Sequence, residues 1–181
     1  MKKLLLVIPL VILLCFTFGC QDKEAMAELE KFRAQAEIEE QNKAVVKQLM
    51  EEFNKKNLDI GEELNTPEYK LHFPIGSEPQ STSQHREVLK AFWGAFPDMT
   101  HTIDRLISAG DMVTGQYTIR GSHTGEFMGI PPTGNQIEET VIGIWRFSDG
   151  KIAEFWGMLD MLSFMQQLGM ELKPKEEKEK N

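Results

Sequence analysis

The spacing of the apolar residues predicts helices early in the chain and strands later. From residue 21 to residue 57 apolar side chains recur every three or four positions, first as a narrow stripe and then, from Asn42, as a wider face. A further helix is predicted to begin after Ser83, a suitable N-cap, and to end before Pro97. The helical part of the domain is therefore expected to come first.

Apolar and polar residues alternate in the later segments, as they do in strands that bury one face. The predicted strands cover residues 69–73, 100–107, 112–122, 137–147 and 152–156. Gly110 and Gly150 mark turns between them, and a closing helix is expected from Asp160 to Leu168. This order indicates an α+β domain, in which a curved antiparallel sheet wraps over the N-terminal helices. Such a sheet leaves a cavity against its helices, a natural site for a small molecule.

The N-terminal segment has the layout of a targeting signal. Lys2 and Lys3 precede an apolar run over residues 4–18, which is shorter than the roughly 20 residues of a membrane-spanning helix. The run ends in TFGC at residues 17–20, which resembles the lipobox of bacterial lipoproteins. That resemblance implies that Cys20 becomes the lipidated first residue of a protein at the bacterial cell envelope. The alternative is a leader that is cleaved conventionally or not at all.

These signals divide the chain into four parts. We expect a lipoprotein signal peptide at 1–19, a lipidated cysteine and helical stalk at 20–41, the folded domain at 42–170, and a charged tail at 171–181. At 1.5 Å per residue the stalk would span roughly 30 Å and hold the domain away from a bilayer.

Charge, cysteines and histidines exclude several classes of function. The formal net charge is −8 and becomes −10 once a leader carrying Lys2 and Lys3 is removed, so nucleic acid is not an expected partner. Cys15 leaves with the leader and Cys20 is lipidated, which leaves the domain without a thiol for a disulfide, a zinc site or a nucleophile. The four histidines have neither HxH nor HExxH spacing, so we expect no metal site.

One later segment is unusual for a loop. Residues 125–134 read GEFMGIPPTG, with the glycines and prolines of irregular chain but large apolar side chains at Phe127, Met128 and Ile130. Water rejects such side chains, so we expect them to fold over apolar surface. Whether they close a ligand pocket or meet a second subunit is open at this point, and a purely structural role is the other interpretation.

Several stretches together form a specific pattern. They are AFPDM at 95–99, SAGDMV at 108–113, RGSHTGEFMGIPPTGNQI at 120–137, RFSDGKIAEFW at 146–156 and QLG at 167–169. In these stretches the chain resembles the SnoaL-like polyketide cyclases, also called ester cyclases, of the NTF2-like superfamily. The resemblance covers about residues 44–169. It implies the NTF2-like cone fold, frequent homodimers and chemistry without a cofactor.

The same resemblance bears on catalysis. Family cyclases move protons beside a carbonyl group with an aspartate that a histidine assists, and an ungapped alignment puts these two residues at Gly157 and Gly143. Neither glycine can exchange a proton. Asp160 and His72 match another common aspartate and a frequent histidine of the family, and both are our catalytic candidates. The structural alternatives are a helix N-cap for Asp160 and a solvated or hydrogen-bonded side chain for His72.

Other residues are candidates for lining a ligand pocket. Gln116 and Thr118 share a strand face that could offer hydrogen bonds to a ligand or could equally be solvated. The remaining candidates are large side chains of the sheet and of the loop, which could also be core: Trp145, Phe155, Trp156, Phe127 and Met128. We expect His85 and His101 at the surface and His123 to orient the loop by hydrogen bonding.

Three functions follow from these observations. The first is a membrane-anchored, cofactor-free acid–base enzyme that acts on a small hydrophobic carbonyl compound. The second is an envelope lipoprotein that binds a small apolar molecule without changing it, which the two glycines favour. The third is a structural protein whose domain serves to form a homodimer on a stalk. A fold alone does not decide among them.

Overall fold

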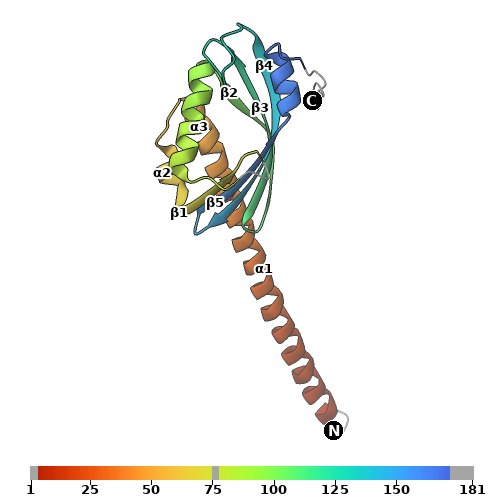
Figure 1. Ribbon diagram of the computed structural model, residues 1–181. Coiled ribbons are helices and arrows are strands. Elements are labelled where there is room, and N and C mark those ends of the chain that lie inside the picture. Colours follow the sequence, from red (N-terminus) through yellow and green to blue (C-terminus); the bar gives the residue numbers. More distant parts are fainter. Residues whose placement is uncertain (1–3, 75–77, 172–181) are drawn as a thin grey trace, which may run out of the picture. The chain divides into compact units, whose positions relative to one another are not determined.

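The computed structural model describes residues 4–74 and 78–171, with side chains described from residue 23 onward. It divides the chain into two compact units, Met1–Ile38 and Glu39–Asn181. Helix α1 (Leu4–Asn54) supplies the described part of the first unit and continues into the second (Figure 1). The second unit is the domain described below.

A five-stranded sheet organises this domain. After α1 the elements are α2 (Ile60–Leu64), β1 (Asn65–His72), α3 (Thr82–Ala95), β2 (Thr100–Ala109), β3 (Met112–Ser122), β4 (Gln136–Ser148), β5 (Lys151–Leu159) and α4 (Met161–Gln167). The strand order is β1-β5-β4-β3-β2. Strands β2 to β5 pair antiparallel with their neighbours, whereas β1 joins β5 in parallel. The predicted α+β class is confirmed, but the sheet is mixed rather than wholly antiparallel.

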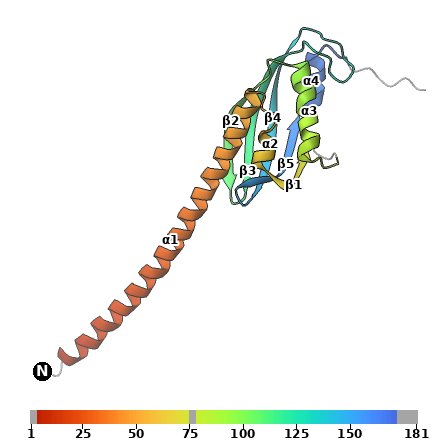
Figure 2. The same cartoon turned by 90° about the vertical axis from the view of Figure 1, so that its left-hand side faces the viewer.

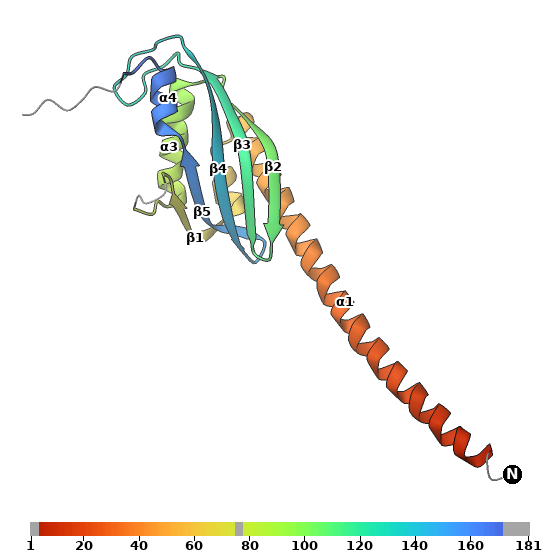
Figure 3. The same ribbon diagram turned by 90° about the vertical axis from the view of Figure 1, so that its right-hand side faces the viewer.

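The helices cover one face of the sheet. The end of α1, α2 and α3 lie over this inner face, and Figures 2 and 3 show the sheet from its two sides. In β4 every second residue from Ile137 to Phe147 is buried, as the alternating pattern predicts. The core takes side chains from both layers, among them Val46 of α1 and Trp145 of β4.

Two details of the helices differ from the prediction. Ser81, not Ser83, caps α3: its Oγ accepts a hydrogen bond from the Gln84 backbone N–H, and the Gln84 side chain accepts one from the Ser81 N–H in return. This capping box satisfies two N–H groups that the helix leaves unpaired. Helix α2 was not predicted, because its five residues are too few to show a helical period.

The apolar loop closes the core at the end of α3. Phe127 and Ile130 exchange two backbone hydrogen bonds around Met128 and Gly129, whose φ angles are +51° and +80°, as in a type I′ turn. Phe127 is 5% exposed and contacts three aromatic rings of the core, Phe92, Phe96 and Phe164. Met128 is 72% exposed. Phe127 therefore has a structural role, because these rings surround it.

Glycine is required where this loop meets α3. Thr124 and Gly125 both donate backbone hydrogen bonds to the Ala95 carbonyl, and a Cβ on Gly125 would lie 2.1 Å from the Gly94 carbonyl oxygen. His123 is fully buried, and its Nδ1 lies 3.0 Å from the Thr133 hydroxyl. The start of the loop is thus held against the end of α3, and the two ends of the loop are joined to each other through His123.

The side chains of the predicted N-terminal signal lie outside those that the structure describes. The structure gives residues 4–22 a helical backbone but no described side chains, so the lipobox and Cys20 are not tested. Within the part of the chain whose side chains are described, no helix is both long enough and apolar enough to cross a membrane. All of the predicted tail except residue 171 also lies outside the described ranges.

A candidate ligand cavity

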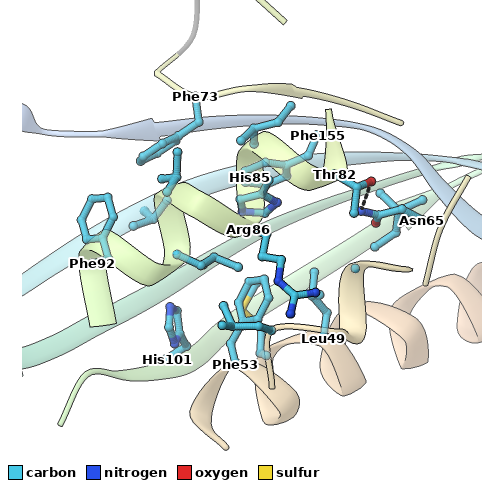
Figure 4. Close-up of a pocket in the computed structure, with 18 of the residues that line it drawn as sticks. Leu49, Phe53, Asn65, Phe73, Thr82, His85, Arg86, Phe92, His101 and Phe155 are labelled. Carbon is cyan, nitrogen blue, oxygen red and sulfur yellow. Dashed lines mark hydrogen bonds between the residues drawn. The ribbon is translucent and has the colours of Figure 1, made fainter. Parts of the chain in front are cut away.

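A cavity lies between the helices and the inner face of the sheet. The space open to the centre of a water molecule is about 100 Å³, well above the roughly 10–15 Å³ that one water needs. Much of the lining is apolar and includes Leu49, Phe53, Phe73, Phe92 and Phe155 (Figure 4). Trp145 of β4 also lines the cavity. The cavity can therefore hold a small, mainly apolar molecule.

A histidine and a tyrosine form one polar pair in the lining. His85 of α3 places its Nδ1 3.4 Å from the hydroxyl of Tyr69 on β1, and the two rings are stacked 6.1 Å apart. Burial lowers the pKa of His85 to about 4 and raises the pKa of Tyr69 well above its usual value. At neutral pH the pair therefore consists of an uncharged imidazole and a protonated phenol.

A second histidine is fixed at the start of β2. The Asn54 side chain at the end of α1 accepts a hydrogen bond from the His101 backbone N–H at 2.6 Å and donates one to its carbonyl at 2.9 Å. Burial, and to a lesser degree the charge of Lys56, lowers the pKa of His101 to about 4. The nearby Tyr117, whose ring centre lies 6.2 Å from His101, has its pKa raised by burial. This pair is also uncharged at neutral pH.

Trp93 brings an unused hydrogen-bond donor to the cavity. Its side chain lines the cavity and is 8% exposed, and its Nε1 has no hydrogen-bond partner among the described residues. The ring packs edge-on against Phe53, with centres 6.0 Å apart, and the Lys56 ammonium lies 5.4 Å from the ring centre. A buried N–H without an acceptor costs free energy, so this group favours a ligand that supplies one.

Arg86 is the cationic side chain among the described residues that line the cavity. It extends from α3 in the direction of α1 (Figure 4) and forms an ion pair with Asp59, whose side chain is 69% exposed. None of the described residues that line the cavity is acidic. Among the described residues there is also no group of three His, Cys, Asp or Glu side chains that could hold a metal ion.

Comparisons with known proteins place this domain. Residues 44–168 match the family model described as SnoaL-like polyketide cyclase, which is more than half of the chain. The chain belongs to the SnoaL-like polyketide cyclase family. Wild-type IdmH from Streptomyces antibioticus, a candidate polyketide cyclase, is 33% identical and superposes with a TM-score of 0.64, over 71% of this chain and 99% of its own.

Two further solved structures share the fold. AclR, a candidate hydroxylase from Streptomyces galilaeus, is 24% identical with a TM-score of 0.67, over 72% of this chain and 97% of its own. A SnoaL-like polyketide cyclase candidate from Jannaschia sp. CCS1 is 22% identical with a TM-score of 0.68, over 75% of this chain and 96% of its own. The NTF2-like cone is thereby confirmed. No curated protein matches the chain in sequence.

The SnoaL-like domain has glycines in a row on the inner face of the sheet. Gly115 pairs with Gly143, and Gly143 pairs with Gly157, on three neighbouring strands. All are buried on the inner face. The positions to which the family resemblance assigns the catalytic aspartate and histidine, 157 and 143, therefore lie side by side.

Aromatic rings take up the space over this row. A Cβ on Gly143 would lie 2.7 Å from the Trp145 ring and 2.8 Å from Phe155, and a Cβ on Gly157 would lie 2.5 Å from Phe73. Trp145 and Phe155 pack with ring centres 5.0 Å apart. We call Phe73, Trp145 and Phe155 the aromatic floor. Where the family pattern expects two side chains that exchange protons, this SnoaL-like domain has an apolar wall.

Two of the predicted pocket residues line the cavity, and the others lie elsewhere. Trp145 and Phe155 belong to the aromatic floor. Gln116, Thr118 and Trp156 are on the opposite face of the sheet, because they alternate with the inward residues of β3 and β5. Thr118 donates a hydrogen bond to Asp104 at 2.8 Å, and Trp156 stacks on His72. Phe127 and Met128 do not line the cavity either, for the reasons given above.

The two catalytic candidates also lie outside the cavity lining. His72 is on the outer face of β1, with its Nε2 3.2 Å from Glu154, which in turn accepts hydrogen bonds from Arg146. Asp160 caps α4 by accepting backbone hydrogen bonds from Leu162 and Ser163, both at 3.0 Å. Both side chains make the contacts that the structural alternatives predict, and the cavity does not bring them together.

The sequence interpretation missed His85 and His101, which it expected at the surface. A helical signal existed for His85: it lies four residues before Leu89 and seven before Phe92, and all three line the cavity. His101 gave no such signal, because its burial depends on the end of α1 packing across it through Asn54.

Proposed function

We propose that this SnoaL-like domain is a cofactor-free acid–base enzyme of the cyclase or isomerase type. Its substrate is a small, mainly apolar compound that carries a carbonyl group. The observation that carries this proposal is the uncharged His85–Tyr69 pair inside an apolar cavity. The family membership of residues 44–168 supports the reaction type.

The pair supplies a base and a proton donor together. In the tautomer whose Nδ1–H donates to the Tyr69 oxygen, Nε2 of His85 keeps a free lone pair, and the Tyr69 O–H is available to a ligand. His85 then removes a proton from the carbon beside the carbonyl, and the electron pair moves onto the carbonyl oxygen. The Tyr69 hydroxyl stabilises this enolate by a hydrogen bond. Return of the proton to another atom completes an isomerisation. Alternatively, attack of the enolate carbon on a second carbonyl closes a ring, and the alkoxide formed there takes the proton back from His85.

Deuterium exchange of a simple ketone tests this mechanism. The full-length protein is used, so that the result does not depend on a fragment folding by itself. In D₂O at pH 7 the domain should catalyse exchange of the methyl protons of 2-acetylnaphthalene, followed by NMR. We expect His85→Gln to abolish the exchange and Tyr69→Phe to slow it about 10- to 100-fold.

The matched control is His72→Gln, which replaces a histidine outside the cavity in the same way. It should leave the exchange rate unchanged. Exchange that survives in His85→Gln and disappears in His72→Gln would refute the assignment of the base.

A second function is favoured by the glycines on the inner face of the sheet, beneath the aromatic floor. Positions 143 and 157 hold no group that can exchange a proton, and the aromatic floor occupies the space there. A protein that binds a small apolar molecule without changing it would have this wall. In that case the domain binds 2-acetylnaphthalene but catalyses no exchange above the rate of free imidazole.

We also propose that the domain is carried on a membrane by lipid on Cys20 and forms homodimers. The N-terminal sequence pattern supports the anchor. Mass spectrometry of the mature N-terminus and loss of membrane association in Cys20→Ala test it. For the dimer, the support is exposed apolar side chains on the outer face of the sheet, Ile142 at 43% and Met158 at 55%, which are register partners. Sedimentation of the wild type and of Met158→Lys tests it.

A further inference from the structure

Two polar groups of α3 in the cavity are available to a ligand. One has no hydrogen-bond partner among the described residues, and the other has a partner that a ligand could replace. They are the Trp93 N–H and the Arg86 guanidinium, and both side chains line the cavity. The two residues are seven positions apart, which is about two helical turns and therefore the same side of the helix. Seven residues correspond to a rise of roughly 10 Å along α3. A ligand that used both groups would have to be of about this length.

The Trp93 N–H is a hydrogen-bond donor without an acceptor among the described residues. Its side chain is more than nine-tenths buried, and its Nε1 has no partner among the described residues. The indole N–H is a donor only, so the missing partner must be an acceptor. Most surfaces around it are apolar or already used: Phe53 packs against the ring, and the Lys56 ammonium donates to the Met99 carbonyl. An oxygen atom of a bound molecule would satisfy this donor.

The Arg86 guanidinium is suited to bind an anionic group of a ligand. Among the described residues its ion-pair partner is Asp59, whose exposed carboxylate is stabilised by water when the pair opens. Arg86 contacts Asp59 through Nη1, whereas a guanidinium carries five N–H donors and is suited to two-point binding of a carboxylate. None of the described residues of the lining is acidic and could compete, even though the whole chain has a net charge of −8.

We propose that the cavity takes an amphiphilic carboxylic acid. Its carboxylate binds Arg86 in place of Asp59, its apolar body lies on the aromatic floor, and a further oxygen about 10 Å away accepts a hydrogen bond from Trp93. This proposal rests on the proposed function, since it uses the same cavity and names the substrate class. His85 is adjacent to Arg86 in α3, so the reacting carbonyl is near the carboxylate end.

Four naphthalene probes separate these contacts. Naphthalene has neither group, 2-naphthoate has the carboxylate, 2-naphthol has the oxygen, and 6-hydroxy-2-naphthoate has both at opposite ends of one rigid body. Their dissociation constants for the full-length protein can be measured from probe fluorescence. We expect 6-hydroxy-2-naphthoate to bind most tightly and naphthalene most weakly.

Two substitutions assign each contact. Arg86→Gln should weaken the two carboxylate probes about 10- to 100-fold and leave naphthalene and 2-naphthol unchanged. Trp93→Phe keeps the ring packing and should weaken only the two hydroxyl probes, about three- to tenfold. Lys90→Gln removes the same charge from the exposed side of α3 and should change none of the four. Unchanged affinity for naphthalene also shows that each variant is folded.

Each outcome decides the proposal. It is overturned if the carboxylate adds no affinity in the wild type, or if Arg86→Gln weakens all four probes equally. Failure of naphthalene itself to bind would remove the apolar cavity on which the proposed function also depends. Normal binding of all probes without deuterium exchange would contradict the proposed chemistry alone, and it would leave the amphiphilic acid as the ligand of a binding protein.

Discussion

Replacing Gly157 by alanine puts a methyl group where aromatic rings already lie. The new Cβ would be 2.5 Å from Phe73 and 2.8 Å from Phe155, whereas carbon atoms pack best at about 3.5–4.0 Å. Phe155 cannot retreat freely, because it is buried and packs against Trp145. Overpacked cores lose about 1–3 kcal/mol, so we expect Gly157→Ala to lower the free energy of unfolding by about 2 kcal/mol.

Urea unfolding of the domain, followed by far-UV circular dichroism, measures this loss. With a slope of about 2 kcal/mol/M for a domain of this size, the midpoint should fall by about 1 M. The matched control is Gly94→Ala in α3, where no described atom lies within 4 Å of the new Cβ. That change should stabilise the helix by about 0.5–1 kcal/mol.

A second variant shows that the rings are the cause. Gly157→Ala combined with Phe155→Leu makes room for the methyl group, so the two changes together should cost less than the sum of the separate costs. If Gly157→Ala were as stable as the wild type, the aromatic floor would not be packed against this strand as described, and the explanation for the glycine would fail.

Three other predictions follow from the placement of single side chains. The free energy of unfolding should fall as the pH drops from 6.5 to 4, by about 1–2 kcal/mol for each of His85 and His101. The reason is that each imidazole has a pKa of about 4 in the folded protein and near 6.5 in the unfolded chain, so the unfolded chain binds more protons in this range. Urea titrations of the double Gln variant should show a flatter dependence, and an unchanged one would contradict the burial of these rings. Asp160→Ala should cost about 1 kcal/mol through loss of the α4 cap and leave deuterium exchange unchanged; slower exchange at full folding would restore Asp160 as a catalytic candidate. Phe127→Ala should cost about 3–5 kcal/mol in urea unfolding but leave the affinity for naphthalene within twofold, since Phe127 is core and not lining.

The fold was predictable where local signals agree with the tertiary structure. The bounds of β3 at residues 112 and 122 match the prediction, because Gly110 marks a turn on one side and strict alternation continues to the other. The parallel pairing of β1 with β5 was not predictable, since no local pattern states which edge a distant strand joins. The sequence offers two nearby serines, Ser81 and Ser83, as the cap of α3. Ser81 is the cap because the Gln84 side chain accepts a hydrogen bond from its backbone N–H.

The site was harder to predict than the fold. A strand pattern tells which residues share a face but not which face is covered, so Trp156 and Gln116 were placed in the pocket although they lie outside it. His85 was missed because a polar residue on an apolar helix face was interpreted as solvated. Its burial comes from Phe53 and Tyr69, which are distant in the chain.

The packing of Phe73, Trp145 and Phe155 over bare backbone has an evolutionary consequence. The rings fill the space that a side chain at position 143 or 157 would need. A residue that exchanges protons at either position therefore cannot be present together with these rings. A single substitution cannot convert one wall into the other without passing through an overfilled core. Sequences of this family should therefore fall into two groups, with either the acid–base pair or the rings, and intermediates should be rare.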